Sequence, residues 1–332
     1  MDTLIRFGFN QRVRGQIVRL DKSWLPIVTH HQQYGQRDVP PTVRERLGEL
    51  SSAALLLATS LKFDGSLLLQ IQGTGPARLF LAECRADGRF RATVKLNESA
   101  PIPHDASFQD LVNPDGQGRF AVTLVPAKKD EQRGMGPENP YQGIIPFEGD
   151  TVAEVLEHYM TMSEQLPTRM WLAASEQAAF GLLLQVMPGT SDEDQDGHNE
   201  GALLWEQVQA LADTLTREEM LTLPPEEILR RLFWETNIQA FDLRKPVFSC
   251  TCSRDKVAGM LKMLGEVEVR SILAEQDGEI QVHCEFCRLP YRFDENQALA
   301  LFDEPDAATD TSEGATEAGS TEDSGADTRE GG

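Results

Sequence analysis

The sequence has few cysteines, a shortage of positive charge and no long run of apolar residues. Only 5 of its 332 residues are cysteine, and 31 lysines and arginines oppose 53 aspartates and glutamates, for a formal charge of −22. Because nucleic-acid binding needs a positive surface, this balance argues against a nucleic-acid partner. No apolar run reaches the ~18 residues of a membrane span, and the first ten residues, MDTLIRFGFN, lack the apolar segment of a signal peptide. We therefore expect no membrane partner and a cytoplasmic location.

Acidic residues gather in two stretches of the chain. Residues 303–332 contain ten acids and one arginine, a charge of −9, which leaves −13 for the rest. Because this stretch also lacks large apolar residues, it predicts a disordered acidic tail. Residues 192–200 carry five acids and no lysine or arginine, which predicts a solvated acidic loop.

The region between Val13 and Met187 alternates strand-like stretches with helices. One helix is expected after Pro41, because apolar residues follow at helical spacing, and another after Thr151, which forms a capping-box pattern with Glu154. The expected strands cover residues 67–73, 78–84, 89–96, 120–126, 141–147, 170–174 and 181–187, the first three as an antiparallel meander. This layout predicts an α+β fold, with helices packed on a mostly antiparallel sheet.

Two amphipathic helices are expected after the acidic loop. The first carries one apolar face, and the second begins at Pro224 and Pro225 and carries another. The apolar residues are Leu204, Val208, Leu211 and Leu215 in the first helix, and Ile228, Leu229, Leu232 and Phe233 in the second. Both faces need an apolar surface to pack against.

Four of the five cysteines form two close pairs near the carboxyl end of the chain. Cys250 and Cys252 are separated by one residue, Cys284 and Cys287 by two, and 31 residues lie between the pairs. Two short chelating turns of this kind supply the four thiolates of a tetrahedral Zn²⁺ site, and a cytoplasmic compartment disfavours permanent disulfides. Because four sulfur ligands leave no open position for water, we do not expect zinc catalysis.

Two uses of such a site remain open from the spacing. The zinc can be a permanent structural ion, or the thiolates can switch between metal and disulfides. Arg254, Lys256 and Arg288 stand nearby in the sequence and favour the thiolate form that oxidants attack. A disulfide across the single residue between Cys250 and Cys252 is a tight ring that is easily reduced, as a reversible switch requires.

Several blocks of the sequence are distinctive. They are FSCTCSRDKV (248–257) and ILAEQDGEIQVHCEFC (272–287), and the earlier blocks LKFDGSLLLQIQGTGP (61–76), EGDTVAEVLEHYMTMSEQLPTR (148–169) and LLLQVMP (182–188). In these blocks, and over about residues 10 to 300, the chain resembles the 33 kDa chaperonin family, redox-regulated heat-shock holdases of the bacterial cytoplasm.

The resemblance implies a mechanism. It implies that Cys250, Cys252, Cys284 and Cys287 bind one Zn²⁺ per chain when reduced. It implies that oxidant releases the zinc and forms the disulfides Cys250–Cys252 and Cys284–Cys287. It further implies that the protein is not an enzyme but an ATP-independent chaperone, whose oxidised form is a homodimer that holds unfolded or partly unfolded client proteins.

Composition and resemblance together predict four segments and leave one rival function. The segments are an α+β core domain for client binding and dimerisation (1–188), an acidic loop and helical linker that loosens on activation (189–246), a zinc-binding redox-switch domain (247–302) and the tail (303–332). The rival is an adaptor or regulator in which the zinc on the four cysteines is purely structural. Cys84, which has no partner nearby in the sequence, is expected to be a structural thiol.

Overall fold

The computed structural model describes residues 1–34, 38–60, 64–127, 140–187 and 197–303, with the side chains of residues 197–200 excepted. The chain divides into two compact units. The first unit comprises Met1–Val257 and Gln281–Arg292, and the second comprises Ala258–Ile280 and the chain from Phe293 onward. Of the predicted acidic loop (192–200) and tail (303–332), residues 192–196 and 304–332 lie outside the described residues, whereas residues 197–200 begin a helix and Asp303 ends one. The four predicted segment boundaries stay a prediction.

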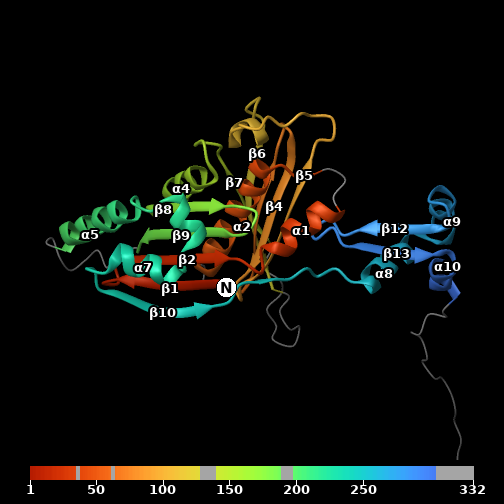
Figure 1. Cartoon of the computed structure of the whole chain (residues 1–332). Helices are drawn as coiled ribbons and strands as arrows, with labels where there is room; N and C mark the ends of the chain where they lie inside the picture. The colour runs from red at the N-terminus through yellow and green to blue at the C-terminus, as the bar shows by residue number, and fades with distance from the viewer. Residues whose placement is uncertain (35–37, 61–63, 128–139, 188–196, 304–332) are drawn as a thin grey trace, which may run out of the picture. The chain divides into compact units, whose positions relative to one another are not determined.

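A five-stranded antiparallel sheet, here called sheet A, has the strand order β10-β1-β2-β9-β8 (Figure 1). Its strands are β1 (Thr3–Phe9), β2 (Val13–Leu20), β8 (Thr168–Ala174), β9 (Ala179–Val186) and β10 (Ile238–Arg244). Strand β1 alternates Ile5, Phe7 and Phe9 on one face with Leu4, Arg6 and Gly8 on the other. Both faces of the sheet are covered, since residues of both sets are buried.

A six-stranded sheet, here called sheet B, has the order β11-β5-β4-β3-β6-β7. Its strands are β3 (Gly65–Gln72), β4 (Ala77–Arg85), β5 (Arg89–Leu96), β6 (Arg119–Pro126), β7 (Tyr141–Ile145) and the short β11 (Val247–Phe248). The meander β3-β4-β5 is antiparallel as predicted, and Gly88 at its second turn has φ +86°, a value that glycine adopts without steric cost. Strand β11 pairs in parallel with Arg89 and Phe90 of β5.

Helix α2 (Pro41–Ser60) is the centre of the main hydrophobic core. It contacts strands of both sheets, and 14 of its residues, from Val43 to Thr59, are buried. The other helices of this part are α1 (Leu25–Tyr34), α3 (Phe108–Val112) and α4 (Val152–Met162). Thr151 caps α4 as predicted by accepting a hydrogen bond from the Glu154 amide, but the Glu154 carboxylate accepts from the Asp150 amide and so does not close a capping box. The apolar stripe expected for this helix extends to Leu61, which lies outside the described residues.

The segment after the acidic loop packs its helices on sheet A. Helices α5 (Gly197–Ala212), α6 (Arg217–Thr222) and α7 (Pro225–Phe233) cover the face that carries Phe7 and Phe9, and α5 and α7 are seen against strands β8, β9, β2 and β1 in Figure 1. The aromatic ring of Phe233 lies 5.0 Å from that of Phe9 and 6.0 Å from that of Phe7. The apolar surface that the sequence pattern required is therefore one face of sheet A.

The carboxyl-terminal part has a small core. It contains α8 (Arg254–Leu264), α9 (Glu266–Glu275), α10 (Glu295–Asp303) and a two-stranded sheet of β12 (Glu279–His283) and β13 (Pro290–Asp294). In the second unit, the buried apolar side chains that the structure describes are Leu261, Val269, Leu273, Ile280, Phe293 and Ala298. So small a core contributes little stability by itself.

The α+β prediction is confirmed, but the strands form two larger sheets instead of one, and α3 and several other elements were not expected. Strand β1 precedes the expected region, and β10 lies within the stretch predicted as a linker. Helix α6 was also missed, since the pattern indicated two helices where the structure has three. Among the described residues, no helix is both long and apolar enough to cross a bilayer.

Candidate functional site

The first cysteine pair lies in a loop that leaves the edge of sheet B. The Ser249 amide donates to the Phe90 carbonyl, which continues the pairing of β11 with β5. Helix α8 then begins at Arg254, where the Ser253 hydroxyl accepts a hydrogen bond from the Lys256 amide. Cys250 and Cys252 are thus held in a short loop between a strand and a helix.

The second pair lies in the tight turn between β12 and β13. The Cys284 amide donates to the Leu289 carbonyl over 3.0 Å, and the Arg288 amide donates to the Cys284 carbonyl over 2.9 Å. Arg288 adopts φ +59°, a left-handed conformation that is uncommon for a residue with a side chain. These bonds bend the backbone so that Cys284 and Cys287 point to the same side of the turn.

The two loops bring all four sulfur atoms together. The four Sγ atoms lie within 4.8 Å of one another, with 3.6 Å between those of Cys250 and Cys284 and 3.4 Å between those of Cys252 and Cys287. Both of these contacts join one loop to the other. All five cysteines are free thiols in this structure.

The sulfur positions fit a tetrahedral metal ion. With metal–sulfur bonds of about 2.3 Å, the sulfurs of a zinc site built from four cysteines stand about 3.8 Å apart, close to the separations observed here. The sulfurs are also near enough to exchange hydrogen bonds, chiefly from Cys284 and then from Cys287, which lowers the pKa of Cys250. The cluster can therefore hold a metal ion, and its ligand set of four thiolates is compatible with Zn²⁺.

The three basic residues that were expected near the cysteines each have an identified neighbour. Lys256 donates from Nζ to the Thr251 carbonyl, and Arg254 donates to the Arg292 carbonyl over 2.6 Å. Arg288 faces His31, whose imidazole is buried. Burial first, and then the charges of Arg288 and His30, lower the pKa of His31 to about 4.

Strand β5 provides contacts to both loops that the sequence did not reveal. Arg91 donates to the Thr251 hydroxyl over 3.0 Å, and its guanidinium carbon lies 3.8 Å from the centre of the Phe286 ring. Thr93 donates to the Glu285 carbonyl over 2.9 Å, and Lys95 forms an ion pair with the Glu285 carboxylate. The alternation in 89–96 places these three side chains on one face of the strand, but no local pattern shows what covers that face.

The fifth cysteine stands apart from the cluster. Cys84 is fully buried on β4, and burial strongly raises the pKa of its thiol. Buried thiols of this kind are inert and pack as small apolar side chains. Its surroundings agree with a structural thiol.

Comparison with known protein families shows which family this chain belongs to. Residues 2–294 match the family model described as Hsp33 protein. The chain belongs to the Hsp33 family. Its relatives include a protein named 33 kDa chaperonin from Methylobacillus flagellatus, 43% identical over 304 residues, which are 91% of this chain and 94% of the relative. A second, from Nitrosococcus oceani, is 39% identical over 312 residues, which are 94% of this chain and 98% of the relative.

A solved structure agrees with the fold of this Hsp33-family chain. The crystal structure of the 33 kDa chaperonin from Thermotoga maritima superposes with a TM-score of 0.68 and covers 90% of this chain and 97% of its own. Its sequence identity is 21%, so it supports the fold alone.

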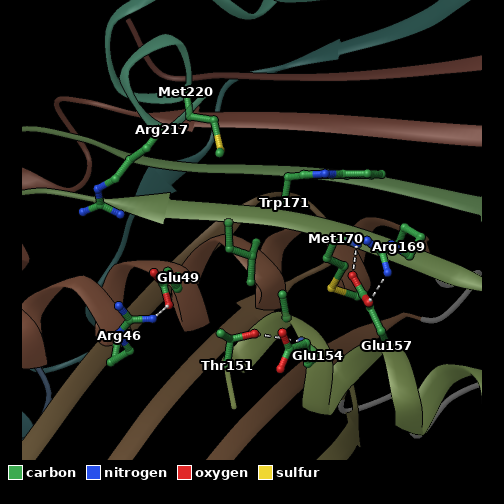
Figure 2. Close-up of a pocket in the computed structure, with 12 residues that line it drawn as sticks. Arg46, Glu49, Thr151, Glu154, Glu157, Arg169, Met170, Trp171, Arg217 and Met220 are labelled. Atoms are coloured by element: carbon green, nitrogen blue, oxygen red, sulfur yellow. Dashed lines mark hydrogen bonds and ion pairs between the residues drawn. The ribbon is translucent and has the colours of Figure 1, made fainter. Parts of the chain in front are cut away.

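A cavity of about 390 Å³ lies where α6 meets the main core in this Hsp33-family chain (Figure 2). Arg217 and Met220 of α6 line it together with Arg46 and Glu49 of α2. The Glu49 carboxylate accepts from Arg46 over 2.7 Å, yet its side chain is only 6% exposed. Burial outweighs the attraction of Arg46 and raises the pKa of Glu49 to about 7.

Glu49→Gln is expected to stabilise the protein increasingly as pH rises. The folded-state pKa of Glu49 lies above the ordinary value of 4.5. The stability that protonated Glu49 gives the folded protein is therefore fully present below pH 4.5 and is lost as pH rises through 7. Between pH 5 and pH 8, the free energy of unfolding of the variant should gain about 2 kcal/mol relative to the parent. Denaturant unfolding at several pH values measures this difference.

Glu45→Gln is the matched control for that measurement. Glu45 lies one helical turn earlier, pairs with Arg46 and Arg217, and is 29% exposed. Its substitution removes a partly exposed carboxylate from the same helix and leaves the buried Glu49 in place. Parallel stability curves for the parent and Glu49→Gln would contradict the assignment of the raised pKa to Glu49.

Proposed function

We propose that this chain is an ATP-independent holdase chaperone of the cytoplasm that binds unfolding proteins and protects them from aggregation under oxidative and heat stress. The reduced form holds one Zn²⁺ on Cys250, Cys252, Cys284 and Cys287, and oxidation of these thiolates activates it. The names of the relatives support the chaperone function. The observation that carries the switch is the convergence of four sulfurs from two loops that are distant in sequence.

Zinc, when bound, ties the two loops to each other and stabilises the thiolate form of the four cysteines. Oxidation instead joins near neighbours, Cys250 to Cys252 and Cys284 to Cys287. For each pair, two thiolates give two electrons to one hydrogen peroxide molecule, so that one S–S bond forms and the O–O bond breaks. Two protons from solvent complete two water molecules. The local disulfides close rings of only three and four residues and no longer connect the loops.

Release of the loops loosens the segment that precedes them. Helices α5 to α7 bury the apolar face of sheet A, and this is the surface that undocking exposes. Once exposed, an apolar face of this kind can bind the exposed apolar segments of client proteins without recognising a specific sequence. The oxidised chain forms a homodimer, and the protein is not an enzyme and binds neither nucleic acid nor membranes.

A peroxide titration tests this function. The zinc-loaded protein is treated with peroxide at elevated temperature, and zinc release, free thiols and the light scattering of an aggregating client are followed together. Zinc release, loss of four thiols and suppressed aggregation are expected in parallel. A Cys250→Ser, Cys252→Ser variant should lose the reversible response, whereas Cys84→Ala should retain it.

The rival function gives a different result in the same titration. If zinc leaves but the reduced and oxidised forms protect the client equally, the zinc is structural and the chain is an adaptor or regulator. A normal reversible response in the Cys250→Ser, Cys252→Ser variant would contradict the switch residues named above.

A further inference from the structure

One arginine outside the cysteine loops touches both of them. Arg91 lies on β5, about 160 residues before the first pair, and contacts the residue in the middle of the first loop and a residue within the second. These residues are Thr251, between Cys250 and Cys252, and Phe286, between Cys284 and Cys287. We propose that Arg91 is a positioning residue that holds the two loops in the arrangement that retains metal. The inference rests on the proposed assignment of the four cysteines as zinc ligands.

The guanidinium is itself fixed by a neighbour on the sheet. Glu83 stands directly opposite Arg91 on β4, and its carboxylate accepts from Arg91 Nε over 2.7 Å. The side chains of Arg91 and Glu83 are 21% and 20% exposed. With two donors held by Glu83, a third nitrogen reaches Thr251 while the flat face of the group stacks on Phe286. The orientation that serves both loops is therefore set by sheet B.

Shape, more than charge, accounts for this role. Glu83 balances the positive charge of Arg91, so the pair adds little net charge beside the thiolates. A planar fork that donates in three directions and stacks on an aromatic ring is a property of arginine that lysine lacks. Groups that orient metal ligands without touching the metal typically change its affinity 10- to 100-fold.

The neighbouring contacts strengthen the same docking surface. Thr93 is only 2% exposed because the second loop covers it, and its hydroxyl holds the Glu285 carbonyl. Lys95 pairs with the Glu285 carboxylate. Arg91, Thr93 and Lys95 alternate with the core residues of β5, so one strand face anchors the second loop, and among these three side chains Arg91 also reaches the first.

Competition for zinc in the full-length reduced protein tests the inference. We expect Arg91→Lys to weaken zinc binding about tenfold or more, measured against a chromophoric chelator. Phe286→Leu removes the ring that Arg91 contacts and should also weaken zinc binding. Arg89→Lys is the matched control, since Arg89 lies two residues away on the same strand, is exposed, and pairs with Asp87. Thermal unfolding and circular dichroism of each variant confirm that the sheets are intact.

The outcomes separate this inference from the proposed function. If Arg91→Lys and Phe286→Leu bind zinc as tightly as Arg89→Lys, the positioning role is wrong. In that case the proposed function still holds if the parent protein responds to peroxide. If the parent binds zinc and Arg91→Lys binds it at least tenfold more weakly, the positioning role holds even where peroxide fails to activate the parent. A parent that does not bind zinc overturns both.

Discussion

Removal of zinc from the reduced protein is expected to unfold the cysteine loops while leaving sheets A and B folded. The part of the chain beyond Phe248 has a small apolar core, and the hydrogen bonds inside each loop are few. Structural zinc contributes on the order of 10 kcal/mol of folding free energy in domains of this size, far more than such a core supplies. Amide hydrogen exchange with and without a chelator should show lost protection in 249–257 and 279–294 and unchanged protection in β2, β3 and β9.

Single substitutions separate metal loss from general destabilisation. Cys284→Ser should reproduce the exchange pattern of the chelated protein, because it removes one of four ligands. Cys84→Ala removes a thiol that is more deeply buried than Cys284 and lies outside the cluster, and it should leave exchange in 249–257 unchanged. Protection of the loops that survives complete chelation would show that the contacts to β5 suffice to fold them.

Local sequence signals predicted the elements that form from neighbouring residues. The meander β3-β4-β5 was predicted because apolar alternation and the Asp87–Gly88 turn are both local. The two cysteine pairs were recognised for the same reason. Helices α5 and α7 were predicted from their apolar faces, which are periodic in the sequence.

Pairings between distant residues could not be predicted in this way. Strand β10 pairs with β1 across more than 220 residues, and several of its side chains, among them Phe241 and Leu243, are exposed. Strand β10 therefore lacks the regular alternation of apolar and polar residues by which a half-buried strand is recognised in a sequence. The contact of Arg91 with Thr251 likewise joins segments 160 residues apart. From the sequence alone, the polar residues of β5 are indistinguishable from those of a face exposed to solvent.

Phe233→Ala is expected to activate the reduced, zinc-loaded protein without peroxide. Phe233 is 1% exposed and fits between Phe7 and Phe9 of β1, where α7 meets sheet A. Truncation of a buried phenylalanine costs about 3 to 5 kcal/mol, and here the loss falls on the docking of one short helix. The helix segment should therefore open more often than the core of sheet A, which exposes the apolar face that we propose for client binding.

Three measurements on the same sample test this expectation. Amide exchange should accelerate in 204–233, binding of an apolar fluorescent dye should rise, and client aggregation should fall while zinc stays bound and all thiols stay reduced. Trp234→Ala is the matched control, because the neighbouring ring is 74% exposed and its removal should change none of the three. If Phe233→Ala opens the segment and binds dye but does not protect the client, the face of sheet A under α5 to α7 is not the client surface, and activation must expose another part of the chain.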